Sequence, residues 1–235
     1  PKLGDYAFPC FKLGKNPQEE AQKLKEKIKL PEYISKIEVA GAYLNFFLKN
    51  HSLAEQTLTT IYQQAKNYGK KSDNKNKSQK IVVEYCGPNT NKPLHLGHLR
   101  NMALGNSVCR ILSFQGNEVF PVNIVNDRGI HICQSMLAYL KWVNNKSPDK
   151  KGDHFVGDYY VLFSKKAQED ENLKQEAQEL LLKWEQGDKE IKTVWKKMNS
   201  WVLEGFAETY HRFGIKFVKE YFESQYYQHG KDLVQ

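Results

Sequence analysis

The stretch that decides the fold runs from residue 81 to residue 98 and reads IVVEYCGPNTNKPLHLGH. Its first residues, Ile81 to Tyr85, form a β-branched run, which suits a strand buried in a parallel sheet. A loop rich in Pro and Asn follows, and His95 and His98 stand where the next helix begins. Because ligands of open α/β sheets bind beyond the carboxyl ends of the strands, this loop is a candidate binding site.

The residues that follow predict the start of a doubly wound α/β sheet. A helix is expected over residues 97–115, with Gly116 suited to its C-terminal cap and four apolar residues on one face: Leu104, Val108, Ile111 and Leu112. Residues 118–125 read as a second strand, and a second helix is marked by apolar residues at helical spacing: Ile130, Cys133, Leu137 and Leu140. From Asn145 onward we expect only helices, over residues 155–167, 173–185 and 189–213.

A polar stretch separates this region from a smaller unit upstream. Residues 69–80 read GKKSDNKNKSQK, contain no apolar side chain and are typical of a linker or an exposed loop. Before them, the patterns predict a small α+β unit. Its expected elements are a strand at 6–11, a helix at 17–29, strands within 37–48 and a helix at 53–68.

The composition leans basic, with 35 Lys and Arg against 27 Asp and Glu, a net charge of +8 and a pI near 9.1. Such a surface concentrates polyanions such as nucleic acids. Much of the excess lies in Lys-rich helices and the linker, so a solvated surface is an equally good reading. The hydrophobic fraction of 40% allows a packed core and argues against wholesale disorder.

The cysteines and the two ends of the sequence indicate in which cellular compartment the protein is expected. The four cysteines form no C-x-x-C pair and fit no zinc site: Cys10, Cys86, Cys109 and Cys133. We therefore expect reduced thiols, no structural metal and a cytoplasmic protein. No run of 18 apolar residues is present and the first residues do not resemble a signal peptide, so no membrane partner is expected. Without an initiating Met, and with a pattern interrupted at Gln235, both ends are expected to be cut.

The H-x-G-H motif at the predicted helix start suits phosphate chemistry. Free N–H groups and partial positive charge at a helix N-terminus favour anions, and Gly97 lets a nucleotide approach the backbone. His95 and His98 can donate hydrogen bonds to phosphate oxygens, and Lys92 adds a mobile positive charge. Two other interpretations of the histidines stay open: a metal site, for which no third ligand is near, and a purely structural pair.

The segment Val82–Asn101 resembles the signature of class I aminoacyl-tRNA synthetases, and within that class it is most similar to the arginyl-tRNA synthetases. It shares the acidic Glu84 at the strand end, G-P-N at 87–89 and K-P-x-H-x-G-H-x-R at 92–100. Three further segments also match this family: GDYAFP at 4–9, GAYLNF at 41–46 and NDRG at 126–129.

The resemblance implies an α/β fold in several parts. These are a small α+β domain at 1–69 that contacts tRNA, a linker at 70–79, the first half of a class I Rossmann-like parallel sheet at 80–144 and a mainly helical insertion, truncated, at 145–235. The second half of the sheet and its lysine-bearing loop are missing. We therefore expect an N-terminal fragment, monomeric and inactive by itself. Lys196-Lys197-Met198-Asn199-Ser200 is only superficially similar to the missing loop, because it lies inside a predicted helix.

The resemblance also implies the reaction of an arginine–tRNA ligase, in which ATP with Mg²⁺ activates arginine to arginyl-adenylate before the arginyl group passes to tRNA. The implied ATP contacts are Lys92, His95, Gly97 and His98, of which Lys92, His95 and His98 are also catalytic. Glu84, Asn89 and His95 would hold arginine, and Tyr43 and Asn45 would contact tRNA. From the residues alone, Tyr43 reads as strand packing and Asn45 as a turn amide.

The NDRG segment and the overall function each leave alternatives. Asp127 is expected to cap the helix near Ile130 or to contact substrate, and Arg128 reads equally as a structural ion-pair partner. Two other functions stay open. One is a truncated relative that binds tRNA without catalysis, and the other is an H-x-G-H nucleotidyltransferase that acts on a small metabolite.

Overall fold

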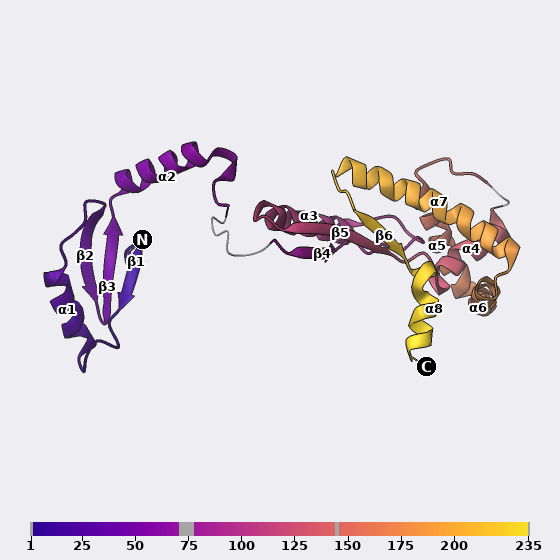
Figure 1. Cartoon of the computed structure of the whole chain (residues 1–235). Helices are drawn as coiled ribbons and strands as arrows, with labels where there is room; N and C mark the ends of the chain where they lie inside the picture. Colours follow the sequence, from indigo (N-terminus) through magenta and orange to yellow (C-terminus); the bar gives the residue numbers. More distant parts are fainter. Residues whose placement is uncertain (1, 71–77, 144–145, 235) are drawn as a thin grey trace. The chain divides into compact units, whose positions relative to one another are not determined.

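The computed structural model describes residues 2–70, 78–143 and 146–234. Chain contacts divide the protein into two units, Pro1–Lys71 and Ser72–Gln235, whose elements are labelled in Figure 1. Most of the predicted linker at 70–79 lies outside the described residues.

The first unit is a three-stranded antiparallel sheet with one helix packed on it. Its elements are β1 (Tyr6–Pro9), α1 (Pro17–Lys27), β2 (Ile34–Ala40), β3 (Tyr43–Leu48), α2 (Asn50–Gln64) and a 3-10 turn (Ala65–Asn67). The strand order is β1-β3-β2, with the chain reversing at Gly41, where φ is 57°. A small apolar core lies between α1 and the sheet: Cys10, Ala21, Ile34, Ile37 and Leu44. The predicted α+β unit is confirmed.

The second unit contains a parallel sheet with helices. Its elements are β4 (Lys80–Glu84), α3 (Leu96–Phe114), β5 (Glu118–Val125), α4 (Ile130–Trp142), α5 (Gly152–Glu169), α6 (Asn172–Glu185), α7 (Lys189–Arg212), β6 (Lys219–Phe222) and α8 (Glu223–Val234). The strand order is β4-β5-β6, and both pairings are parallel. The predicted strand at 118–125 and the α/β class are confirmed.

The expectation that only helices follow Asn145 is wrong for β6. This strand has only four residues, Lys219–Phe222, and pairs with β5 from Val122 to Val125. Its sequence KEYF contains two charged residues and no run long enough to show a period of two, so it gave no strand signal. Helices α4–α7 therefore lie between two neighbouring strands of one sheet, beside which they are gathered in Figure 1.

The main core joins the helices to the inner face of the sheet. It includes Tyr85, which directly follows β4, Met102 and Cys109 of α3, and the buried sides of α4 to α7. The segment at 196–200 lies inside α7, where Met198 and Asn199 are buried, as expected for a helix rather than a loop. The aromatic and aliphatic residues of α7 thus serve the core.

Large apolar side chains are exposed on part of one face of the sheet and along one side of α3. Val82 and Ile124, which alternation places on the same face, are 66% and 48% exposed. Thus β4 is parallel but not buried on both faces as predicted. On α3, the stripe of Leu104, Val108 and Ile111 is also exposed, while Met102, Gly105 and Cys109 make the buried side.

Gly105 allows α3 to approach Tyr85 closely. A Cβ added there would stand 2.2 Å from Cγ of the Tyr85 ring. We expect Gly105→Ala to reduce the free energy of unfolding by about 3 kcal/mol, because overpacking outweighs the better helix propensity of Ala. Gly230→Ala in α8 is the matched control, since nothing lies within 4 Å of its added Cβ. Equal urea midpoints for the two variants would contradict this close-packing account.

Candidate active site

His95 and His98 cap the start of α3 reciprocally. His95 is the N-cap residue, and its Nδ1 accepts a hydrogen bond of 3.1 Å from the backbone N–H of Gly97. The backbone N–H of His95 in turn donates to Nδ1 of His98 at 3.1 Å. The two rings lie together, with centroids 4.0 Å apart. Each imidazole therefore satisfies a backbone donor that the first turn of a helix leaves free.

These bonds fix the tautomer that each neutral histidine adopts. A ring whose Nδ1 accepts a hydrogen bond carries its proton on Nε2, so each neutral ring presents an Nε2–H donor. Burial, assisted by the charges of His95 and Lys92, lowers the pKa of His98 to about 4. At neutral pH His98 is therefore an uncharged hydrogen-bond donor, which suits contact with a phosphate oxygen that gains charge.

The lowered pKa of His98 predicts how stability depends on pH. Between pH 6.5 and pH 4 the unfolded chain binds a proton that the folded chain refuses, so the free energy of unfolding falls as pH falls. We expect His98→Asn, which keeps an acceptor for His95 N–H, to lose about 2 kcal/mol of the change between pH 7 and pH 5. Urea unfolding at both values measures it, with exposed His51→Asn as control. An unaltered pH dependence in His98→Asn would contradict the assignment.

The loop before the motif brings Lys92 next to α5. A Cβ at Gly157 would stand 2.7 Å from Pro93 Cδ and 3.6 Å from Lys92 Cα. Pro93 and the close helix thus restrain the backbone, while the Lys92 side chain is half-buried. At Gly97, an added Cβ would stand 2.9 Å from Cε1 of His95. Gly97 therefore gives the His95 ring room to fold over the helix start, besides the open backbone predicted from sequence.

The Glu84–Asn89 loop contains a strained turn. Glu84 pairs with Val122 at the end of the ladder, and Asn89 forms an isolated bridge with Asn126. The chain therefore advances five residues from Glu84 to Asn89, while the neighbouring strand advances four from Val122 to Asn126. The loop contains one extra residue, as in a β-bulge. Cys86 absorbs the extra residue with φ 89°, a left-handed conformation that costs a non-glycine residue about 1–3 kcal/mol. Such strain is common where a loop positions ligand-binding groups.

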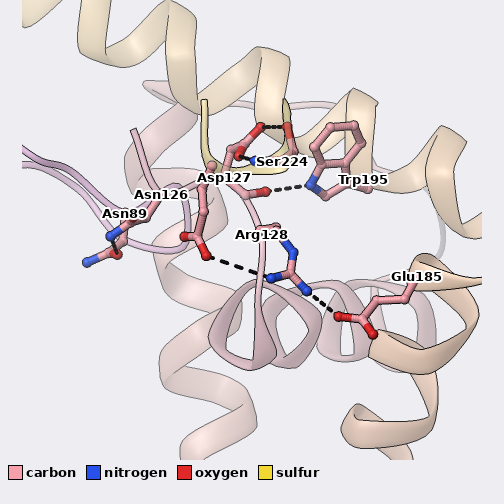
Figure 2. Close-up of polar contacts among 8 residues, drawn as sticks. Asn89, Asn126, Asp127, Arg128, Glu185, Trp195 and Ser224 are labelled. Carbon is pink, nitrogen blue, oxygen red and sulfur yellow. Dashed lines mark hydrogen bonds and ion pairs between the residues drawn. The ribbon is translucent and has the colours of Figure 1, made fainter. Parts of the chain in front are cut away.

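Asn126 ties Asn89 to the neighbouring strand. Its Nδ2 donates to Asn89 Oδ1 at 3.0 Å (Figure 2), and its backbone N–H donates to Pro88 O at 2.9 Å. The Thr90 N–H donates to Asn126 O at 3.0 Å. The predicted arginine-binding residue Asn89 is thus held by an asparagine that sequence reasoning had noted only within NDRG.

Asp127 does not cap the helix that starts at Ile130. That helix has Gly129 as its N-cap and no side-chain cap. Instead, Asp127 Oδ1 accepts from Ser224 N at 2.8 Å and Oδ2 accepts from Ser224 Oγ at 2.6 Å, at the start of α8 (Figure 2). Burial raises the pKa of Asp127, while the bonds from Ser224 oppose that rise. Because Ser224 lies 97 residues away, no local pattern could have revealed this cap.

Arg128 is the ion-pair partner that the sequence suggested. Its guanidinium pairs with Glu185 of α6 and, at 3.7 Å, with Glu223 of α8. It also lies 4.1 Å from the ring centroid of Tyr227. The backbone oxygen of Asp127 accepts from Trp195 Nε1 at 2.6 Å (Figure 2). The loop after β5 is therefore fastened to α6, α7 and α8.

The two predicted tRNA-contacting residues lie on the first unit and differ in exposure. Tyr43 is 42% exposed, with its ring edge-on to Phe11 at 5.2 Å between centroids. Asn45 is only 4% exposed, and its Cβ lies close to Gly4. Tyr43 is therefore the better placed of the two for stacking on a base.

The described residues contain neither a metal-binding cluster nor a helix that could span a membrane. Across residues 2–70, 78–143 and 146–234, no three His, Cys, Asp or Glu side chains are placed to hold a metal ion. Each described helix is too short or too polar to span a bilayer. All four cysteines are free and buried.

The parallel sheet with the H-x-G-H motif at the start of α3 places the chain among the class I synthetases. The chain belongs to the family described as tRNA synthetases class I (R), catalytic domain, whose model matches residues 57–235. The model of the arginyl-tRNA synthetase N-terminal domain matches residues 1–48.

The similar proteins are named arginine–tRNA ligases or arginyl-tRNA synthetases. The chain is 48% identical to an arginine–tRNA ligase of Treponema denticola over 100% of this chain and 41% of the relative. It is 42% identical to that of Borreliella burgdorferi over 99% and 40%. The structure of Thermus thermophilus arginyl-tRNA synthetase matches 94% of this chain and 35% of that chain, with a TM-score of 0.59 and 28% identity. The chain thus spans about two fifths of the length of the curated relatives.

Proposed function

We propose that the complete polypeptide containing this chain is an arginine–tRNA ligase. The observation that carries the proposal is the reciprocal cap of His95 and His98, in which both Nδ1 atoms accept backbone hydrogen bonds and each neutral ring therefore keeps its Nε2–H as a donor. Neutral donors fixed before the substrate binds stabilise charge as it develops on a phosphate. Membership of the synthetase family supports the same reaction.

The proposed first step forms arginyl-adenylate. A carboxylate oxygen of arginine attacks the α-phosphorus of ATP, the bond to the β-phosphate oxygen breaks, and pyrophosphate leaves with the bonding electrons. The ATP contacts are Lys92, His95, Gly97 and His98, and the arginine contacts are Glu84, Asn89 and His95. The Glu84 carboxylate suits the cationic amino group of arginine. Mg²⁺ enters with ATP, held by its phosphates, since such sites commonly rely on substrate oxygens.

The proposed second step transfers the arginyl group to tRNA. A ribose hydroxyl of the terminal adenosine attacks the activated carbonyl, and AMP leaves. The first unit contacts the tRNA, with Tyr43 stacked on an unpaired base and Asn45 nearby. We place the protein in the cytoplasm, because four free buried thiols suit a reducing compartment, and we propose that it acts as a monomer.

The experiment that tests this function uses the complete polypeptide. With tRNA present, arginine-dependent exchange of pyrophosphate into ATP and charging of the tRNA with arginine are expected, and neither should occur with lysine. Binding of tRNA without exchange would favour the second candidate, a non-catalytic tRNA-binding relative, for which the exposed Tyr43 is the supporting observation.

Tyr43 provides a separate test of the tRNA contact. We expect Tyr43→Ala to raise the KM for tRNA about tenfold, because base–aromatic stacking contributes roughly 1–3 kcal/mol. Tyr62→Ala is the matched control, since Tyr62 is 88% exposed on α2 and no role is proposed for it. An unchanged KM for tRNA in Tyr43→Ala would remove this contact from the proposal.

A further inference from the structure

Asn123 lies inside β5 with 0% of its surface exposed, and its carboxamide is bonded at both ends. Its Oδ1 accepts from the backbone N–H of Gly87 at 3.1 Å. Its Nδ2 donates to Glu220 Oε1 at 2.8 Å and to Tyr210 Oη at 3.2 Å. A buried amide whose donor and acceptor are both hydrogen-bonded holds the groups that it joins in one geometry.

The Gly87 bond replaces a missing rung of the β-ladder. The Tyr85 N–H still donates to Val122 O at 3.1 Å, as a regular parallel strand does. The backbone then turns away from β5 at the extra residue, Cys86. The next residue, Gly87, has φ 60°. The side-chain oxygen of Asn123 reaches the N–H that the backbone of β5 no longer meets.

The same carboxamide connects the turn to β6 and α7. Glu220 belongs to β6 and Tyr210 to α7. The Tyr210 hydroxyl also lies 3.7 Å from Sγ of Cys86, the strained residue itself. Asn123 is therefore the point at which the turn, α7 and β6 meet.

We propose that Asn123 is a positioning residue for the amino-acid substrate. By holding the Cys86–Gly87 turn in its strained form, it fixes the spacing between Glu84 and Asn89. Glu84 Oε1 lies 4.0 Å from the position that a Cβ on Gly87 would take. A shift of this turn would therefore change the contact between Gly87 and the Glu84 carboxylate. The choice of arginine as substrate rests on the proposed ligase function. The structural half of the inference, that Asn123 holds the Cys86–Gly87 turn, does not depend on that function.

The kinetic test replaces Asn123 in the complete polypeptide. Asn123→Leu keeps a similar volume but loses the acceptor for Gly87 and the donor for Glu220 and Tyr210. We expect the KM for arginine in pyrophosphate exchange to rise about tenfold, while the KM for ATP changes less than about twofold, because one buried hydrogen bond is lost on the arginine side only. Equal rises in both KM values, or no rise for arginine, would overturn the proposal.

A polarity swap distinguishes positioning from general damage. Asn123→Asp places two carboxylates together, because Glu220 lies at 2.8 Å, and is expected to impair arginine binding. Combining Asn123→Asp with Glu220→Gln restores one donor facing one acceptor and keeps the acceptor for Gly87, so the KM for arginine should return to within about threefold of the original. Glu220→Gln alone, which keeps an acceptor for Asn123, is the control. Failure of the double variant to recover while it remains folded would overturn the proposal.

Hydrogen exchange separates this inference from the proposed function. If the complete polypeptide shows no arginine-dependent exchange of pyrophosphate in the presence of tRNA, the ligase proposal fails, and the KM comparison fails with it. The peptide spanning residues 84–90 then decides the structural half by amide hydrogen exchange. Faster exchange in Asn123→Leu, recovered in the double variant, supports a turn held by Asn123. Unchanged exchange would overturn it.

Discussion

The 235-residue chain by itself is expected to form arginyl-adenylate at less than about one thousandth of the rate of the complete polypeptide. The reason lies in the exposed side of the sheet, where Val82 and Ile124 are open to solvent. In the described residues, β4 has β5 as its one neighbouring strand, so its other edge is free. A site bounded on one side orients ATP and arginine poorly, and orientation alone contributes several kcal/mol to such reactions.

The measurement compares pyrophosphate exchange by the purified chain and by the complete polypeptide at equal concentration. Adding the remaining polypeptide in trans is the control, since docking on the open β4 edge and the α3 stripe should restore part of the rate. Circular dichroism on the chain distinguishes lost activity from lost folding. Comparable rates for the chain and the complete polypeptide would contradict this expectation and show that the described residues hold a sufficient site.

The elements predicted well from sequence are those whose signals are local. The strand at 118–125 has a β-branched run bounded by Gly116 and an Asn-Asp pair, and its limits match β5. The predicted start of α3 at residue 97 lies one residue from its observed start at Leu96, because the cap that His95 forms with Gly97 is contained within one turn. Signals contained within a few residues survive folding because no distant partner is needed to produce them.

The features missed were those set by distant partners. Strand β6 exists because β5 offers it an edge, not because KEYF prefers a strand. Asp127 caps α8 rather than α4, since Ser224 returns beside it after four intervening helices. The exposed stripe of α3 reads as a core face in sequence, because hydrophobic spacing does not say which layer covers it.

The candidate site shows the same division. His95, Gly97 and His98 are close in sequence, and their arrangement follows from the helix start. Asn123 gave one usable signal, an amide in the middle of an apolar strand, which implies a buried partner. Its partners on Gly87, Tyr210 and Glu220 could not be named without the fold.

Replacing either histidine with Asn in the complete polypeptide is expected to reduce the kcat of adenylate formation about 100- to 1,000-fold. The side-chain oxygen of Asn can stand near the place of Nδ1, so His98→Asn keeps an acceptor for the His95 N–H. His95→Asn likewise keeps an acceptor for Gly97 N–H. Each variant retains the cap but loses the Nε2–H donor, and loss of one such donor typically costs about 3–4 kcal/mol of transition-state stabilisation.

Gln substitution supplies the matched comparison, because its amide nitrogen reaches toward the position of Nε2. His98→Gln should keep more of the kcat than His98→Asn while losing more stability, since the bond from His95 N–H is weakened. Single-turnover formation of arginyl-adenylate and urea unfolding measure both quantities for four variants, in which His95 or His98 is replaced with Asn or Gln. If activity followed stability across them, the histidines would serve only to cap α3. If activity followed the Nε2 donor instead, they would act directly on the phosphate.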